Sequence, residues 1–249
     1  MHINSVRRAT VAVAALGTLF ATLTACGGHA RSDGAPGSGG RGGQGRTASP
    51  TPTADPTRIP GVGDRLQRRI PAGSRQVVAV YGKGRNSADS TVVLYTRRGD
   101  AWHPVRSWAA HNGRKGWTTD HHEGDKRSPV GVFTLSDAGG VLPDPGAKLP
   151  YDHNEAAYTP PAEWDADHQH DFDYIIAIDY NRVPGTPPGN ATRPQGQAKG
   201  GSIWLHMDHK SGTSACVSVP KNAMRYLLRT LDPADHPVVV MGDRADLSA

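Results

Sequence analysis

Seven short runs of β-branched and aromatic residues constrain the fold of this chain more than any other feature. Each run is bounded by Gly, Pro, Asn or Asp, as the strands of a sheet commonly are. The segment RRGD between the second and third runs predicts a hairpin turn. The runs are QVVAVYG (76–82), STVVLYTR (90–97), AWHPVRSW (101–108), GVFTL (131–135), DYIIAIDY (173–180), SIWLHM (202–207) and HPVVVMG (236–242). The sequence therefore predicts a mainly β domain.

One segment departs from the strand pattern. In PKNAMRYLLRTLDP (220–233), apolar residues recur at helical spacing between a proline that can begin a helix and a proline that can end it. This predicts one helix shortly after Cys216. Residues 140–172 are rich in Pro, Asp and His and show no clear period, so we expect loops over one end of the sheet.

The N-terminus has the pattern of a bacterial lipoprotein signal. Arg7 and Arg8 precede a 17-residue apolar run that ends in Leu-Thr-Ala, and Cys26 follows directly. A permanent transmembrane helix needs about 20 apolar residues, so the run is short for that alternative. We expect residues 1–25 to be a cleaved signal peptide and Cys26 to carry the lipid. The protein is then exported and anchored to the outer face of the cell membrane, facing the wall.

A stalk follows the expected lipid anchor. Residues 27–58 contain almost no large apolar side chains and are dominated by Gly, Pro, Ser and Thr, a composition that cannot bury a core. We expect a lipidated, disordered stalk over residues 26–70. Residues 71–249 have the length of one domain with its own core.

The net charge of +5 is unevenly distributed. It divides into +2 for residues 1–26, +4 for residues 27–70 and −1 for residues 71–249. A nucleic-acid partner would require a basic patch on the folded part, so we expect none. The basic stalk suits anionic lipid or wall polymer, although a solvated run without a partner has the same composition.

Cys216 is the candidate nucleophile. The chain has two cysteines, and lipidation of Cys26 would leave Cys216 without a disulfide partner outside the cell. The strand SIWLHM carries His206 at its end, next to Met207, and a loop containing Gly212 leads to Cys216. A neighbouring imidazole can take the thiol proton and return it to a leaving amine, and the backbone N–H groups around Ala215 can stabilise an oxyanion. The alternative is a buried packing cysteine beside a surface histidine.

The surrounding motifs resemble the L,D-transpeptidase catalytic-domain family, also called YkuD-like. The family has a strand ending in His, a loop and Ser/Thr-x-Gly-Cys, which His206 and TSACV resemble. HHEGDKRSPVGVFTL resembles the family's Glu-Gly-Asp-x-x-Thr-Pro-x-Gly-x-Phe segment, with Ser128 in place of Thr. RKGW and DYIIAIDYN are similar to further family segments, so the resemblance covers about residues 73–243. It implies a β-sandwich-like fold.

The chain departs from the family pattern at the nucleophile. Ala215 replaces the glycine before the cysteine, Ser214 replaces a histidine, and Ser218 replaces an asparagine or arginine. If the position before Cys216 requires a positive φ, alanine is strained there. The loop between His206 and Thr213 is also short.

The resemblance implies that Cys216 attacks an L,D peptide bond of a peptidoglycan stem peptide and passes the acyl group to an amine or water, without a cofactor. His206 would then act as base and acid, oriented by a backbone carbonyl near Met207. The oxyanion site would involve Ser214 and Ala215. The expected substrate-binding residues are Thr213, Glu123, Asp125 and Trp204, although the Glu-Gly-Asp segment also suits a purely structural turn.

His209 is the other histidine near Cys216 in sequence. His206 closes an apolar strand, which gives its ring a rigid support. His209 lies in the polar segment DHKSG, where we expect a mobile, solvated side chain. We therefore assign the general base to His206.

Two other functions fit parts of the sequence. A zinc hydrolase is suggested by DHHEGD (120–125) and DADHQHDFD (165–173), and an extended HQH segment would place both rings on one face. No third ligand stands at a recognisable spacing, so we expect no metal. The second alternative is a wall-binding lipoprotein whose catalysis is lost through Ala215.

We predict that Cys26→Ser releases the protein from the membrane fraction, because acylation of Cys26 is the expected anchor. Membrane fractionation and N-terminal mass analysis measure this. A Cys26→Ser protein that stays membrane-bound at full yield with an unchanged N-terminus would contradict the lipoprotein assignment.

Overall fold

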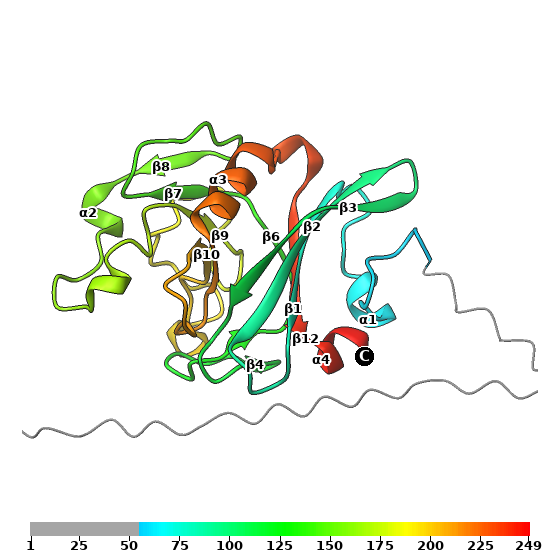
Figure 1. The fold of residues 1–249 in the computed structure, drawn as a ribbon, viewed down its shortest axis with the longest axis horizontal. Helices are drawn as coiled ribbons and strands as arrows, with labels where there is room; N and C mark the ends of the chain where they lie inside the picture. Colours follow the sequence, from blue (N-terminus) through cyan, green and yellow to red (C-terminus); the bar gives the residue numbers. More distant parts are fainter. Residues whose placement is uncertain (1–54) are drawn as a thin grey trace, which may run out of the picture. The chain divides into compact units, whose positions relative to one another are not determined.

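The computed structural model describes residues 55–249. These residues fold around one mixed sheet of ten strands (Figure 1). The strands of the sheet are β1 (Gln76–Gly82), β2 (Asp89–Arg98), β3 (Ala101–His111), β6 (Gly131–Thr134), β7 (Ala138–Gly140), β8 (Tyr151–His153), β9 (Ile175–Ala177), β10 (Trp204–Met207), β11 (Val217–Val219) and β12 (Val238–Asp243). Their spatial order is β6-β12-β1-β2-β3-β11-β10-β9-β7-β8. A separate two-stranded ladder joins β4 (Trp117–Thr118) to β5 (Ser128–Pro129).

Helices are short and few in the part of the chain that the structure describes. They are α1 (Asp64–Gln67), α2 (Glu155–Tyr158), α3 (Lys221–Thr230) and α4 (Arg244–Ser248), with 3₁₀ turns η1 (Ala166–His168), η2 (Gln197–Lys199) and η3 (Pro233–Asp235). The fold is mainly β, as the sequence predicts.

The predicted strands are all present, and most have shifted ends. Each of the seven runs contains a strand, and β2 and β3 form the expected hairpin. DYIIAIDY is the least regular, because only Ile175–Ala177 is extended in the sheet. The predicted helix is α3, which begins directly after Pro220. Residues 140–172 are less irregular than expected, because they contain β8, α2 and η1.

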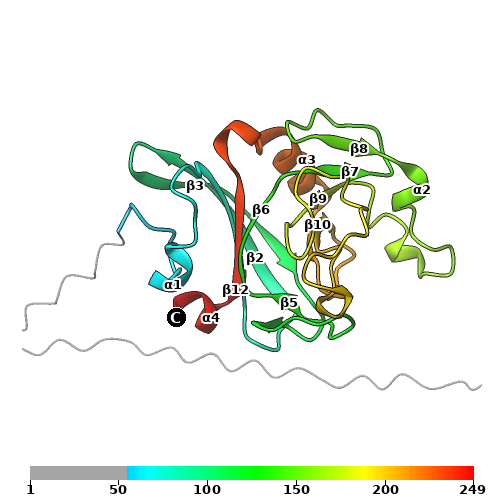
Figure 2. The same cartoon turned by 180° about the vertical axis from the view of Figure 1, so that it is seen from behind.

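Side-chain alternation on β1 separates two apolar cores. Val78 and Val80 point into the larger core, whereas Val77 and Ala79 point into a second core on the opposite face. In both views α1 and α4 lie on one side of β1 and β12, and β9 and β10 lie on the other (Figure 1 and Figure 2). Strands β1 and β12 are thus buried on both faces, which explains their nearly unbroken apolar sequences.

The second core corrects the expected length of the stalk. Ile59, Val62 and Leu66 are buried against Val77, Val238 and their neighbours. Residues 59–67 therefore belong to the folded unit, so the expected stalk does not extend to residue 70. The cause is that three apolar side chains spaced through a polar segment suffice to cover one end of a sheet face.

Helix α3 supports the strand that follows Cys216. Its buried face contributes Met224, Leu227 and Leu228 to the larger core. The same core contains Leu205 of β10 and Val217 of β11. The helix and the two strands are thus fixed by one continuous apolar contact.

No helix within residues 55–249 is long and apolar enough to cross a membrane. The expected signal peptide, Cys26 and most of the expected stalk lie outside the described residues.

We predict that Leu66→Ala lowers the free energy of unfolding by about 2–5 kcal/mol, because it removes a fully buried side chain from the second core. Arg68→Ala is the matched control on an exposed side chain nearby, with an expected change within about 0.5 kcal/mol. Urea unfolding measures both. Equal, small effects would show that residues 59–67 do not contribute to the core.

Candidate active site

Strands β10 and β11 place the candidate base and nucleophile on one face of the sheet. The two strands are parallel and pair Leu205 with Val217 and His206 with Ser218. Side chains two residues apart share a face, so Cys216 lies on the same face as Ser218 and His206. Leu205 and Val217 point the other way, into the larger core. The register therefore places imidazole and thiol on the same face of the sheet.

The imidazole of His206 is buried and oriented. Its Nδ1 lies 2.8 Å from the carbonyl oxygen of Met207, so the proton of the neutral ring is assigned to Nδ1. Nε2 is then the unprotonated, basic nitrogen. Burial lowers the pKa of His206 to about 4, which keeps the ring neutral at physiological pH. The expected orientation by a backbone carbonyl near Met207 agrees with this geometry.

The thiol of Cys216 is protonated at rest. Burial raises the pKa of Cys216 to about 12. The backbone N–H of Trp204 donates to Sγ at 3.4 Å, and the thiol donates to the carbonyl of Ser202 at 3.5 Å. Cys216 is free within residues 55–249, in agreement with the absence of a disulfide partner there.

A cavity of about 550 Å³ opens over these residues. Aromatic and charged side chains form its walls, and the ring of Phe172 packs edge-on against those of Trp204 and His206. Its lining includes Arg114, Glu163, Trp164, Asp165, Phe172, Trp204, His206, Thr213, Ser214 and Cys216. Five of the sequence-predicted site residues thus meet at one cavity, and Ala215, between two of them in sequence, is buried.

Two hydroxyls fix the backbone before the nucleophile. Thr213 Oγ1 donates to the carbonyl oxygen of Cys216 at 2.7 Å, and Ser128 Oγ donates to the carbonyl oxygen of Ala215 at 2.6 Å. No hydrogen bond within the described residues uses the backbone N–H of Ala215 or Cys216. These two donors are therefore available for an oxyanion.

Ser128 is the site residue that the sequence analysis did not assign. It is fully buried and accepts a hydrogen bond from the backbone N–H of Gly113 at 2.8 Å while it donates to Ala215. The signal in the sequence was its position in SPVGVF, where the related family carries threonine. A hydroxyl at that position suffices to connect β5 to the nucleophile loop.

The backbone at Ala215 is not strained. Its φ does not lie in the positive range, unlike that of five other non-glycine residues in the described part of the chain. The position therefore does not require the left-handed backbone conformation that favours glycine over alanine.

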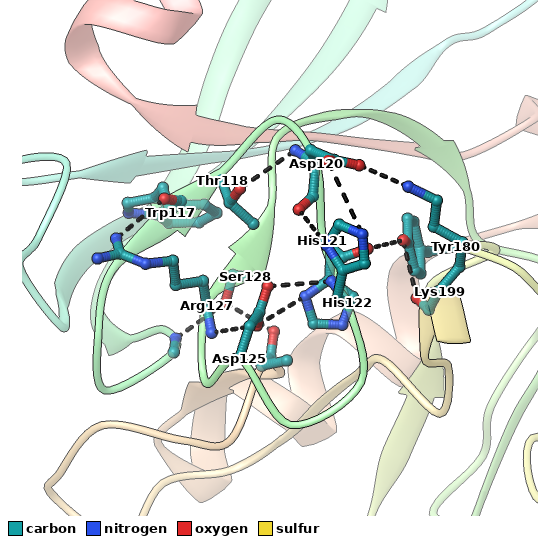
Figure 3. A network of polar contacts seen from close by, with 12 residues as sticks. Trp117, Thr118, Asp120, His121, His122, Asp125, Arg127, Ser128, Tyr180 and Lys199 are labelled. Carbon is teal, nitrogen blue, oxygen red and sulfur yellow. Dashed lines mark hydrogen bonds and ion pairs between the residues drawn. The ribbon is translucent and has the colours of Figure 1, made fainter. Parts of the chain in front are cut away.

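The structure does not bring Glu123 and Asp125 into the cavity. Asp125 instead accepts hydrogen bonds from the backbone N–H groups of His122 and Arg127, at 3.0 and 2.8 Å. Figure 3 shows this turn leading directly to Ser128. Glu123 is exposed, and its backbone N–H donates to Ala198. The segment fits the structural turn that the sequence analysis left open.

His209 is neither solvated nor loosely held, contrary to expectation. Its side chain is 3% exposed, and Nδ1 lies 3.1 Å from the Asp171 carboxylate. Its ring stacks parallel to that of His206, with centroids 6.0 Å apart. The hydrogen bond to Asp171 raises the pKa of His209. The polar residues around His209 gave no indication of its hydrogen-bond partner Asp171, which lies 38 residues earlier in the sequence.

The HQH segment also differs from expectation. Its first histidine ends the 3₁₀ turn η1, so the segment is not extended. His168 Nδ1 lies 2.9 Å from Asp171, whereas His170 is largely exposed and lies 3.4 Å from Asp173. The two rings thus do not act on one ligand, and His168 instead joins Asp171 and His209 on the cavity wall. Although burial opposes it, hydrogen bonds from His209 and His168 hold the pKa of Asp171 below its ordinary value.

Comparison with known proteins identifies the class. The model of the L,D-transpeptidase catalytic domain, YkuD, matches residues 71–240. The chain therefore belongs to the L,D-transpeptidase catalytic-domain family. No curated protein matches the sequence.

Two solved structures have low similarity to the chain. Bd1075 of Bdellovibrio bacteriovorus has 16% identity and a TM-score of 0.39, with 75% of this chain and 52% of that one covered. The helical cell shape determining protein Pgp2 of Campylobacter jejuni has 16% identity and a TM-score of 0.38, and the match covers 67% of this chain and 46% of Pgp2. The chain thus spans about half the length of each.

We predict that Ala215→Gly does not accelerate acylation of Cys216, because alanine is unstrained at this position. The substitution should lower the free energy of unfolding by about 0.4–1 kcal/mol through greater freedom of the unfolded chain. Acylation kinetics and urea unfolding measure the two effects. A tenfold or larger gain in rate would show that the alanine impairs the site.

We predict that alkylation of Cys216 by neutral iodoacetamide rises with pH up to pH 10 without a plateau. The thiolate is the reactive form, and a pKa of about 12 leaves it a minor species throughout that range. Peptide mass mapping follows Cys216 specifically. The unfolded protein is the control, and its alkylation rate should show an inflection at about pH 8.5. A fast, pH-independent rate between pH 5 and 8 would instead indicate a resting thiolate–imidazolium pair.

Proposed function

We propose that this protein is a cysteine-dependent acyltransferase acting on peptidoglycan stem peptides. The observation that carries the proposal is the shared face of β10 and β11, where the Cys216 thiol and the His206 imidazole line one cavity. Membership of the L,D-transpeptidase catalytic-domain family supports the substrate class. The reaction is transfer of the stem-peptide acyl group to an amine, or to water in a carboxypeptidase variant.

The first half-reaction forms a thioester. Sγ of Cys216 attacks the carbonyl carbon of an L,D peptide bond while Nε2 of His206 takes the thiol proton. The N–H groups of Ala215 and Cys216 donate to the resulting oxyanion. Collapse of the tetrahedral intermediate breaks the C–N bond, and His206 returns the proton to the departing amine of the D-amino acid.

The second half-reaction regenerates the enzyme. An acceptor amine or a water molecule loses a proton to His206 and attacks the thioester carbonyl. The C–S bond then breaks, and Cys216 recovers its proton. A neutral thiol beside a neutral imidazole is suited to this sequence, because proton transfer accompanies each attack rather than preceding it.

The cavity suits a peptide with charges at both ends. Arg114 is available to a carboxylate, and Glu163 and Asp165 are available to an amine. Trp204 and Phe172 supply apolar surface between them. Thr213 and Ser214 belong to the wall next to the nucleophile, and we propose Trp204 and Thr213 as substrate-binding residues.

We further propose that the protein acts outside the cell from a lipid anchor at Cys26. A polar segment between Cys26 and Ile59 would let the folded unit reach wall polymer beyond the membrane surface. The sequence pattern at residues 7–26 and the family's substrate support this location.

The decisive experiment is intact-mass analysis of the purified protein after exposure to a carbapenem, a strained acyl donor. One covalent adduct located on Cys216 supports an enzyme, and an absent adduct favours a binding protein. Prior EDTA treatment is the control for the zinc alternative. Acylation should be unchanged by chelation, because thiol and imidazole complete the mechanism.

We predict that His206→Ala abolishes acylation as completely as Cys216→Ala, because base and nucleophile act as one unit. His209→Ala should retain acylation within about tenfold, since His209 faces Asp171 rather than the thiol. Stopped mass-spectrometric time courses of the three variants measure this. An active His206→Ala beside an inert His209→Ala would reassign the base.

A further inference from the structure

His168, Asp171 and His209 form a compact group that the acyl-transfer mechanism does not use. The Asp171 carboxylate lies 2.9 Å from Nδ1 of His168 and 3.1 Å from Nδ1 of His209. The centroids of the two imidazole rings are 4.1 Å apart. One candidate ligand atom from each residue lies within 4.8 Å of the others.

These separations fit a tetrahedral ion. Zinc–nitrogen and zinc–oxygen bonds of about 2.0–2.1 Å place neighbouring ligands about 3.3 Å apart. The distances from Asp171 to the two histidines are only slightly shorter. Replacing the two shared protons by one ion therefore requires small side-chain shifts, and three protein ligands leave the fourth position for water.

Burial and polarity support a bound ion. The Asp171 and His209 side chains are 5% and 3% exposed, and the buried Nε2 of His209 has no hydrogen-bond partner within the described residues. Binding of a metal to Nδ1 of His209 would place the proton of the neutral ring on Nε2.

Access and charge also favour a cation. His168 and His209 line the catalytic cavity on one side and a second cavity of about 490 Å³ on the other. The second cavity is also lined by Asp165, Asp167 and Asp208, with Lys210 as its one basic side chain apart from the histidines. An incoming ion thus meets a predominantly acidic entrance.

We propose that His168, Asp171 and His209 form a binding site for one divalent transition-metal ion of the zinc class. Two imidazoles and a carboxylate are ligands that zinc, cobalt and nickel accept, whereas calcium and magnesium prefer oxygen alone. The ion is not part of the acyl-transfer mechanism, so the inference is independent of the proposed function.

The test is titration of the full-length protein with cobalt(II), followed by displacement with zinc. All variants carry Cys216→Ser, which removes the thiol as a competing ligand. The visible absorption of four-coordinate cobalt reports binding, and isothermal titration calorimetry with zinc gives the stoichiometry. Far-UV circular dichroism confirms that each variant is folded.

The chain offers a matched control two residues from the first ligand. His168→Ala and Asp171→Asn should each weaken binding at least about tenfold, whereas His170→Ala should leave it unchanged. Asp171→Asn is buried, so the more exposed His168→Ala keeps the test valid if the former unfolds. Absent binding, binding that survives His168→Ala, or equal loss in His170→Ala would each overturn the proposal.

Discussion

The parallel pairing of β10 with β11 is the constraint on which the active site depends. Leu205 and Val217 bury their side chains in the larger core, and the strict alternation of a strand then directs His206 and Cys216 to the opposite face. A shift of one residue would exchange the two sets and place the imidazole in the apolar core. The free energy of core burial, to which α3 contributes, thus fixes the catalytic geometry.

Much of this arrangement follows from local sequence. The apolar runs predict the strands, and the spacing of Met224, Leu227 and Leu228 predicts α3, because these patterns reflect which face is buried. The pairing of His206 with Cys216 is also predictable, since a strand, a short loop and a second strand bring both to one place. The alternation in SIWLHM and CVSVP places each side chain on one face of its own strand, and the register of β10 with β11 makes the two faces the same.

The remaining features depend on contacts between distant segments. Ser128 reaches Ala215 across 87 residues, and His209 meets Asp171 across 38. Neither contact is reflected in the periodic pattern of apolar residues from which strands and helices are predicted. Residues 59–67 could not be assigned to the fold from sequence for the same reason. A polar segment with three apolar side chains has the composition of a linker, and only the tertiary structure shows which surface those side chains cover.

The most direct measurement is a crystal structure of the carbapenem-acylated protein. We expect a thioester on Cys216 whose carbonyl oxygen accepts hydrogen bonds from the backbone N–H groups of Ala215 and Cys216. Nε2 of His206 should face the sulfur, with Nδ1 still bound to the carbonyl of Met207. A carbonyl oxygen directed away from both N–H groups, or an imidazole turned from the sulfur, would contradict the claim that the β10–β11 register builds the catalytic site.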